Sequence, residues 1–246
     1  HCRCCDASQI GNADMVDFAK LMNQPLPPVP TVPRLIVGVT GHRPSKLDSA
    51  GLRPSDPGFD GYDRTNPLRR RLCEAMRQKV DDIIATATPD RNHFNAQLID
   101  SYLRQVEWKP GIDWRQLPVL GVSGVALGID QDFCGVLARH APPIPYIAAV
   151  PFPGQDAIWP KPSRRVYAAV LERAVGIVMV SSTRPGDKDE AAKMLSARND
   201  WICCIVDELV SVWDNSSGGT ANCVRGYRRM GKQPHIIDPR DFRVRS

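Results

Sequence analysis

The sequence predicts a three-layer α/β/α domain built on a doubly wound, Rossmann-like parallel sheet. Short apolar runs rich in Val and Ile alternate along the chain with longer amphipathic segments, and glycine and proline gather in the loops between them. Buried parallel strands show such continuous apolar runs. Strict alternation with helices is typical of βαβ units, which place helices on both faces of a sheet.

The 246 residues are enough for one large α/β domain. We expect residues 1–33 to form a helix (6–24) and a proline-rich tether, because proline removes a backbone donor and fixes φ. Residues 34–246 then form the main domain, with an insertion at 88–117 and a long loop at 45–66. The expected strands are 34–40, 119–122, 146–150, 176–180, 209–213 and 235–237. The expected helices are 67–87, 92–106 (within the insertion), 125–140, 163–174, 190–205 and 221–230.

The composition limits the classes of binding partner and the location that we expect for this protein. Lys+Arg 32 against Asp+Glu 27 gives a net charge of +5, which suits a phosphate-bearing partner but is too small to indicate nucleic-acid binding by itself. No run of about 18 apolar residues is present, so no membrane span is expected. The polar start of the chain does not resemble a secretory signal, and we expect a cytoplasmic protein.

Eight cysteines are present, but Cys73, Cys134, Cys203 and Cys204 stand in apolar settings, which favours a reduced chain over a disulfide scaffold. Cys2 and Cys5 form a C-x-x-C near the N-terminus. A zinc site normally needs a second pair of ligands at similar spacing, and none follows. We therefore expect no metal, with Cys2 and Cys5 as weak candidates only.

Three loops that follow predicted strands carry the candidate site. In open α/β sheets ligands bind outside the carboxyl ends of the strands, where loop amides and helix N-termini attract anions. The loops contain glycines that allow a backbone to approach a phosphate, yet they match neither G-x-G-x-x-G nor a Walker A motif. Together they predict a nucleotide-type ligand. The candidate residues are Thr40, Gly41, His42, Arg43, Ser123, Gly124, Ala126, Gly128, Asp130, Asp214, Gly218, Gly219 and Thr220.

Each feature also has a purely structural interpretation. Gly-Gly-Thr before a helix is often only a turn and a cap, and His42 by itself reads as a surface residue rather than a catalyst. Asp130 could simply accept hydrogen bonds from first-turn amides.

Further candidates lie outside these three loops. Arg198 with Asn199 could contact a ligand phosphate, or could form a surface salt bridge of little energetic value. Gln155 and Trp159 follow the strand at 146–150, where Trp159 could stack on a base or pack under its loop.

Several segments of the chain form a recognisable series. They are Thr40-Gly41-His42-Arg43-Pro44, Gly61-Tyr62-Asp63, Ser123-Gly124, Gly128 with Asp130, Pro151-Phe152 with Gln155, Trp159-Pro160, Arg198-Asn199, and Trp213-Asp214 with Gly218-Gly219-Thr220. Together these segments resemble the YpsA-like branch of the SLOG superfamily, which joins the Lonely-guy (LOG) cytokinin-activating hydrolases with the DprA DNA-processing proteins. The similarity runs in order from about residue 34 to 239. It implies a Rossmann-like fold, a nucleotide or ADP-ribose-like ligand at the strand ends, and often a homodimer. Related domains sense nucleotide signals in bacterial conflict systems.

Two departures argue against LOG-type hydrolysis. LOG enzymes carry a catalytic Glu three residues after the Thr of their glycine motif, and this chain has Cys223 there. A thiol cannot do the same acid–base work at neutral pH without a special environment. An acidic residue usual in the family is also replaced, by Cys204. Both changes leave ligand binding intact.

We weigh three functions. The first is binding of a nucleotide-derived ligand, for sensing or sequestration, with no further cofactor. The second is LOG-like cleavage of a nucleotide N-glycosidic bond, with Asp130 or Asp214, or else Asp207 or Glu208, replacing the missing Glu. The third is DprA-like binding of single-stranded DNA, for which a basic C-terminal set could follow a phosphate backbone. That set is Arg225, Arg228, Arg229, Lys232, Arg240, Arg243 and Arg245.

Overall fold

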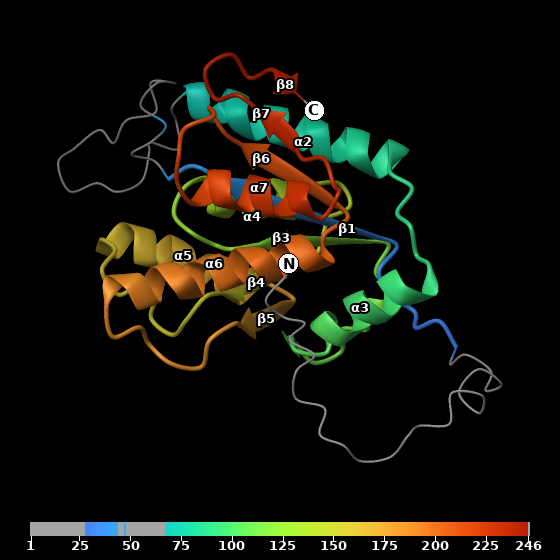
Figure 1. Cartoon of the computed structure of the whole chain (residues 1–246). Coiled ribbons are helices and arrows are strands. Elements are labelled where there is room, and N and C mark those ends of the chain that lie inside the picture. The colour runs from blue at the N-terminus through green and yellow to red at the C-terminus, as the bar shows by residue number, and fades with distance from the viewer. Residues whose placement is uncertain (1–27, 44–46, 48–66, 246) are drawn as a thin grey trace.

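The computed structural model describes residues 28–43, 47 and 67–245. The predicted helix at 6–24 and nearly all of the loop at 45–66 lie outside the described residues. The remainder confirms the predicted fold class, a mostly parallel sheet with helices on both faces (Figure 1).

Eight strands in the described part form one sheet in the order β2-β5-β4-β3-β1-β6-β7-β8. The six central strands are parallel, and all six coincide with predicted strands. The strands are β1 (Leu35–Gly41), β2 (Glu107–Trp108), β3 (Val119–Ser123), β4 (Tyr146–Val150), β5 (Gly176–Met179), β6 (Glu208–Val212), β7 (His235–Ile237) and β8 (Val244–Arg245). After β1 the chain builds outward through β3, β4 and β5, and it then returns to the other side of β1 for β6 and β7. The sheet therefore has a topological switch point between β1 and β6.

Two antiparallel edge strands, β2 and β8, were not predicted. β2 pairs with β5 and β8 pairs with β7. Each is only two residues long, so neither produces a readable alternation of apolar and polar residues. Trp108 of β2 stacks on Trp114 of the insertion at a centroid distance of 5.7 Å, which attaches the insertion to the edge of the sheet.

Six helices of the described part cover the two faces. The helices are α2 (Pro67–Thr86), α3 (His93–Leu103), α4 (Ile129–Arg139), α5 (Lys161–Arg173), α6 (Lys188–Ile205) and α7 (Gly219–Arg229). Leu35, Val37 and Val39 of β1 face α2, α4 and α5, whereas Ile36 faces α3, α6 and α7. This division follows from the period of two along a strand, which sends successive side chains to opposite faces.

Helix α4 begins later than predicted. Its first residue is Ile129, whereas the apolar pattern placed the start at Val125. Val125 has φ +48° and Gly128 has φ +92°, so both lie in the left-handed region and the backbone cannot be helical there. Residues 124–128 are a loop leading into α4, and this loop is the centre of the candidate site.

Candidate functional site

The site lies at the topological switch point, where β1 and β6 run side by side and end together. The register Gly41↔Val212 brings the residues that follow each strand to the same edge of the sheet. His42 directly follows β1, and Asp214 follows β6 after one intervening residue, Trp213. The switch point thus unites two segments that are 172 positions apart in the sequence.

His42 is buried rather than exposed, so the surface interpretation of this residue was wrong. Only 2% of it is accessible, and its Nε2 lies 2.7 Å from Oδ1 of Asp214. Nδ1, on the other side of the ring, is 3.4 Å from Oγ1 of Thr220 in the first turn of α7. With Nε2 protonated, the carboxylate orients the imidazole, and Nδ1 accepts the proton of the threonine hydroxyl. We call Thr220, His42 and Asp214 the histidine relay.

The carboxylate of the relay is strongly stabilised in its charged form. Burial alone would raise the pKa of Asp214, but hydrogen bonds from Ser216 and His42 outweigh it and hold this pKa at about 2. The Ser216 amide donates to Oδ1 at 2.9 Å, an arrangement favoured because Asn215 adopts a left-handed φ of +68°. Asp214 is therefore a permanent anion at neutral pH.

The lowered pKa of Asp214 predicts that the fold loses stability in acid. Because the folded-state pKa lies below the unfolded value, Asp214 stabilises the fold above about pH 4, and this contribution disappears as the pH falls towards 2. We expect the difference in unfolding free energy between the wild type and Asp214→Asn to shrink by about 2 kcal/mol between pH 5 and pH 2. Urea unfolding at a series of pH values measures it. Parallel stability curves for the two proteins would contradict the assignment.

A second buried pair lies beside the relay. Arg198 of α6 and Asp130 of α4 are each only 6% exposed, and Nη1 lies 3.6 Å from Oδ2. Burial raises the pKa of Asp130, and Arg198 and the amide of Ala126 only partly oppose this. The amide donates to Oδ2 at 3.3 Å, so Asp130 binds the loop that precedes α4 as well as the arginine.

Gly124 makes this pairing possible. A Cβ on Gly124 would lie 1.5 Å from Nη1 and 2.3 Å from Cζ of Arg198, so the guanidinium occupies the space that any other residue would fill. The same loop is fastened by Ser123, whose hydroxyl donates to the carbonyl of Asp130 at 2.8 Å and accepts from the amide of Val125 at 3.1 Å. Gly124 therefore leaves room for the guanidinium of Arg198, and Ser123 holds the loop against the backbone of Asp130.

Several buried polar atoms at this edge have no hydrogen-bond partner among the described residues. They include Nε and Nη1 of Arg198 and Oε1 of Gln155. Gln155 follows β4, and its Nε2 donates to the carbonyl of Val125 at 3.4 Å, which leaves its oxygen free. A buried donor or acceptor without a partner costs about 1–3 kcal/mol. The free protein thus holds donors and an acceptor that a ligand would satisfy.

Other candidates occupy different surroundings. Trp159 is buried and packs edge-to-face on Tyr167 at 5.3 Å within the core, so its ring does not line the site as a stacking platform. Thr220 makes no side-chain cap, because the N-cap residue of α7 is Gly218, with φ +135°. Gly219 has open space around it, Arg43 is exposed, and Asn199 is half-buried.

Two of the alternative carboxylates lie at the opposite edge of the sheet. Asp207 precedes β6, where it pairs with Arg91 at 2.5 Å and accepts a hydrogen bond from the amide of Ile36 at 2.7 Å. Glu208 pairs with His235 at 2.8 Å. Both therefore stabilise the amino ends of the strands and cannot replace a catalytic group at the carboxyl ends.

The basic C-terminal set is partly neutralised within the fold. Arg240 and Arg245 both pair with Asp238, and Arg245 also pairs with Asp241. Lys232 donates to the carbonyl of Val206 at 2.7 Å and lies over the ring of Tyr227. These contacts interrupt the basic track that the sequence suggested for a DNA backbone.

Sequence reasoning missed that Cys223 lies next to residues of the candidate site. Its Sγ lies 3.6 Å from Sγ of Cys203, and both thiols are buried. The hydrogen bond from Cys203 and proximity to Thr40 and Arg198 lower the pKa of Cys223. Its position three residues after Thr220 was noted, but nothing in the sequence indicated a partner in α6.

The described residues show neither a metal-binding cluster nor a membrane-spanning helix. This part of the chain does not gather three or more His, Cys, Asp or Glu side chains as a metal site would need, and Cys2 and Cys5 lie outside it. Its helices also include none with the length and apolar character required to cross a bilayer.

Fold and site together define a Rossmann-like α/β protein with a polar site at the switch point of its sheet. The chain is 32% identical over 134 residues to YoqJ, an uncharacterized SPbeta prophage-derived protein of Bacillus subtilis strain 168. The match covers 49% of this chain and 77% of YoqJ. The chain therefore belongs to the same family as YoqJ. No family model matches it.

Two solved structures of the DNA processing protein DprA are similar in architecture. The protein from Streptococcus pneumoniae aligns with a TM-score of 0.46 and 14% identity, over 84% of this chain and 50% of that one. DprA from Helicobacter pylori, studied for its single-stranded DNA binding mode, gives 0.44 and 15%, over 84% and 66%. This chain thus spans about half the length of the pneumococcal protein. What DprA binds is not transferred to it.

Proposed function

We propose that this protein binds a nucleotide or nucleotide-derived anion at the carboxyl edge of its sheet, as the similarity to YpsA-like SLOG proteins implies. The observation that carries the proposal is the buried guanidinium of Arg198, of which two nitrogens have no hydrogen-bond partner in the described part of the chain. A bound anion could offer oxygens to both nitrogens in charge-assisted hydrogen bonds. Because Nε and Nη1 point along different edges of the guanidinium group, they would contact different oxygens.

The surroundings support an anion. Helices α4 and α7 both begin at this edge, and their N-terminal amides and dipoles favour negative charge. Gly219, the first residue of α7, has no heavy atom within 4 Å of where a Cβ would stand, so this helix start is open. Oε1 of Gln155 offers an acceptor for a ligand N–H or hydroxyl group.

The histidine relay favours a second candidate, hydrolysis of a nucleotide N-glycosidic bond. In the relay a hydroxyl, an imidazole and a carboxylate follow one another, as in sites where a base activates a nucleophile and an acid orients the base. His42 rather than Asp130 or Asp214 would then act as the base, accepting a proton through the hydroxyl of Thr220. Asp214 would hold the ring, since its pKa of about 2 makes it too weak a base for that role.

One experiment separates the two functions. The protein is incubated with nucleoside monophosphates, dinucleotides and ADP-ribose, and native mass spectrometry detects bound ligand while chromatography detects freed base. We expect a complex of one ligand class at micromolar concentration, with no freed base. Inorganic sulfate at the same concentration serves as the control for a nonspecific anion.

Other outcomes have defined meanings. Freed base that is lost in His42→Gln would establish the hydrolase instead. No complex and no turnover with any member of the panel would contradict both functions.

A further inference from the structure

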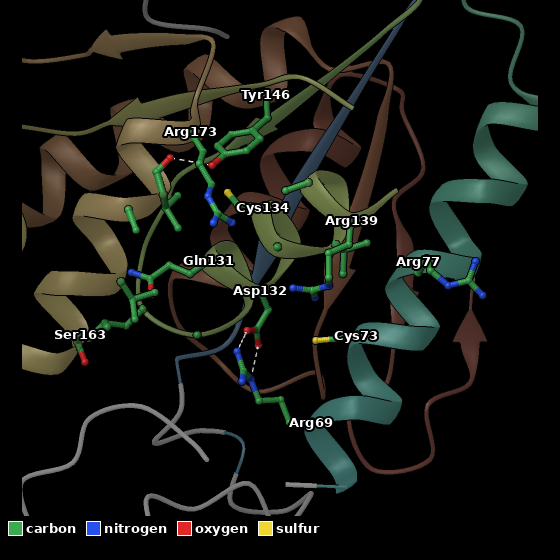
Figure 2. Close-up of a pocket in the computed structure, with 18 of the residues that line it drawn as sticks. Arg69, Cys73, Arg77, Gln131, Asp132, Cys134, Arg139, Tyr146, Ser163 and Arg173 are labelled. Atoms are coloured by element: carbon green, nitrogen blue, oxygen red, sulfur yellow. Dashed lines mark hydrogen bonds and ion pairs between the residues drawn. The ribbon is translucent and has the colours of Figure 1, made fainter. Parts of the chain in front are cut away.

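A groove of about 1070 Å³ lies on the side of the domain, between α2 and α5 and over α4. Figure 2 shows its walls, with Arg69 and Arg77 projecting from α2, Asp132 and Arg139 from α4, and Arg173 from α5. It is separate from the carboxyl-edge site. Gly128 and Gln131 line the groove, whereas Asp130 between them turns towards Arg198.

Arginine dominates the charge of this groove. Among its described lining residues are six arginines, no lysine, and only two acids, Glu74 and Asp132. Both acids are already paired, Asp132 with Arg69 and Glu74 with Arg77. The other four guanidinium groups form no ion pair or side-chain hydrogen bond with any residue in the described part of the chain. They belong to Arg70, Arg139, Arg165 and Arg173.

These charges extend along the groove rather than meeting at one point. Arg165 and Arg173 are eight residues apart on α5, which corresponds to about 12 Å along the helix axis. Helix α4 lies parallel to α2, because Arg69 pairs with Asp132 near their first turns and Asp81 pairs with His140 near their ends. The guanidinium of Arg139 folds back along α4, with Nη1 3.1 Å from where a Cβ on Gly135 would stand. One phosphate could not span the distance between Arg165 and Arg173, whereas a chain of phosphates could.

The floor of the groove is aliphatic, and its described lining has no exposed aromatic ring on which a base could stack. Leu127, Val166 and Val170 are half-buried lining residues. Tyr146, the only aromatic residue in the described lining, is 3% exposed and donates its hydroxyl proton to the carbonyl of Val170. Proteins that bind single-stranded nucleic acid stack bases on exposed aromatic rings. The groove lacks that feature and retains the arginines that recognise phosphate.

We propose that this groove is a second binding site, for a ligand that carries a short chain of phosphates, with its charge along Arg139, Arg173, Arg70 and Arg165. Free oligophosphate and a nucleoside polyphosphate share this chemistry. The apolar floor would accept the base of a nucleoside polyphosphate. The site does not depend on Arg198 or on the function proposed for the carboxyl edge.

Calorimetric titration at low salt with sodium tripolyphosphate and with ATP tests the proposal. The double variant Arg139→Gln/Arg173→Gln is compared with the wild type, and Arg228→Gln on α7 is the matched control. We expect tripolyphosphate to bind the wild type and the control, and the double variant to bind at least about tenfold more weakly. Arg198→Met should leave this binding unchanged, so failure at the carboxyl edge is distinguishable from failure here.

The two probes identify the source of the phosphate chain. The comparison of the two probes is made in Arg198→Met, in which the carboxyl edge is disabled. Equal affinity for tripolyphosphate and ATP in this variant would mean that the phosphates alone are recognised, and tighter binding of ATP would place its base on the floor of the groove. Unchanged tripolyphosphate affinity in the double variant would overturn the proposal. So would binding of a thymidine oligonucleotide without any binding of tripolyphosphate, which would assign the groove to nucleic acid.

Discussion

Replacing Arg198 by Met is expected to lower the affinity for the carboxyl-edge ligand by more than about 100-fold, because two charge-assisted hydrogen bonds of about 1.5–3 kcal/mol each are lost. Methionine matches the length of the aliphatic part of arginine and is unbranched, so it can occupy the same channel beside Gly124. Calorimetry with the ligand class found in the panel measures the change.

Matched variants separate binding from stability. Arg228→Met removes an exposed arginine from α7 and should bind like the wild type. Because Arg198→Met leaves Asp130 buried without its cation, the double variant Arg198→Met/Asp130→Asn should recover unfolding free energy lost by the single variant without recovering affinity. Wild-type affinity in Arg198→Met would remove the basis of the proposed function.

Gly41→Ala is expected to destabilise the fold by about 3 kcal/mol, at the upper end of the usual range for overpacking a core. The added Cβ would lie 2.3 Å from Cγ2 and 2.4 Å from Cβ of Ile129. Ile129 is fully buried as the first residue of α4, and its Cβ cannot move without the helix backbone. Relief therefore requires a shift of β1 or α4, which also displaces Asp130 and weakens ligand binding.

Urea unfolding followed by circular dichroism measures this loss, with Gly219→Ala as the control. No heavy atom lies within 4 Å of a Cβ at Gly219, so that variant should change the unfolding free energy by no more than about 0.5 kcal/mol. Similar stabilities for Gly41→Ala and Gly219→Ala would show that β1 and α4 are not in the tight contact described.

Local patterns in the sequence were sufficient for the six parallel strands and for the presence of the six helices, but not for the two short edge strands. The apolar runs at 35–41 and 146–150 are continuous because both faces of these central strands are covered, and that pattern needs no knowledge of neighbours. The helix starts were less certain. Val125 continues the apolar period of α4, yet its left-handed φ keeps it in the loop, and side-chain periodicity does not report backbone φ.

The candidate site was located by topology but not in detail. Because parallel strands end at one edge, the loops holding His42, Asp130 and Asp214 could be placed together from sequence order alone. Burial was misjudged for His42, since a histidine next to an arginine and a proline resembles an exposed turn. The resemblance to a known family pointed to Arg198, but not to its two unpartnered nitrogens.

The sequence by itself determined the alternation of strands and helices, the parallel sheet and the edge at which polar loops meet. These follow from periodicity and chain direction, which act over neighbouring residues. Only the tertiary structure decided which polar groups pair. His42 meets Asp214, Arg198 enters the space above Gly124, and arginines of three helices line one groove. The reason is that each pair depends on how the helices are rotated and packed against the sheet. That packing is determined jointly by many side chains that are distant in the sequence.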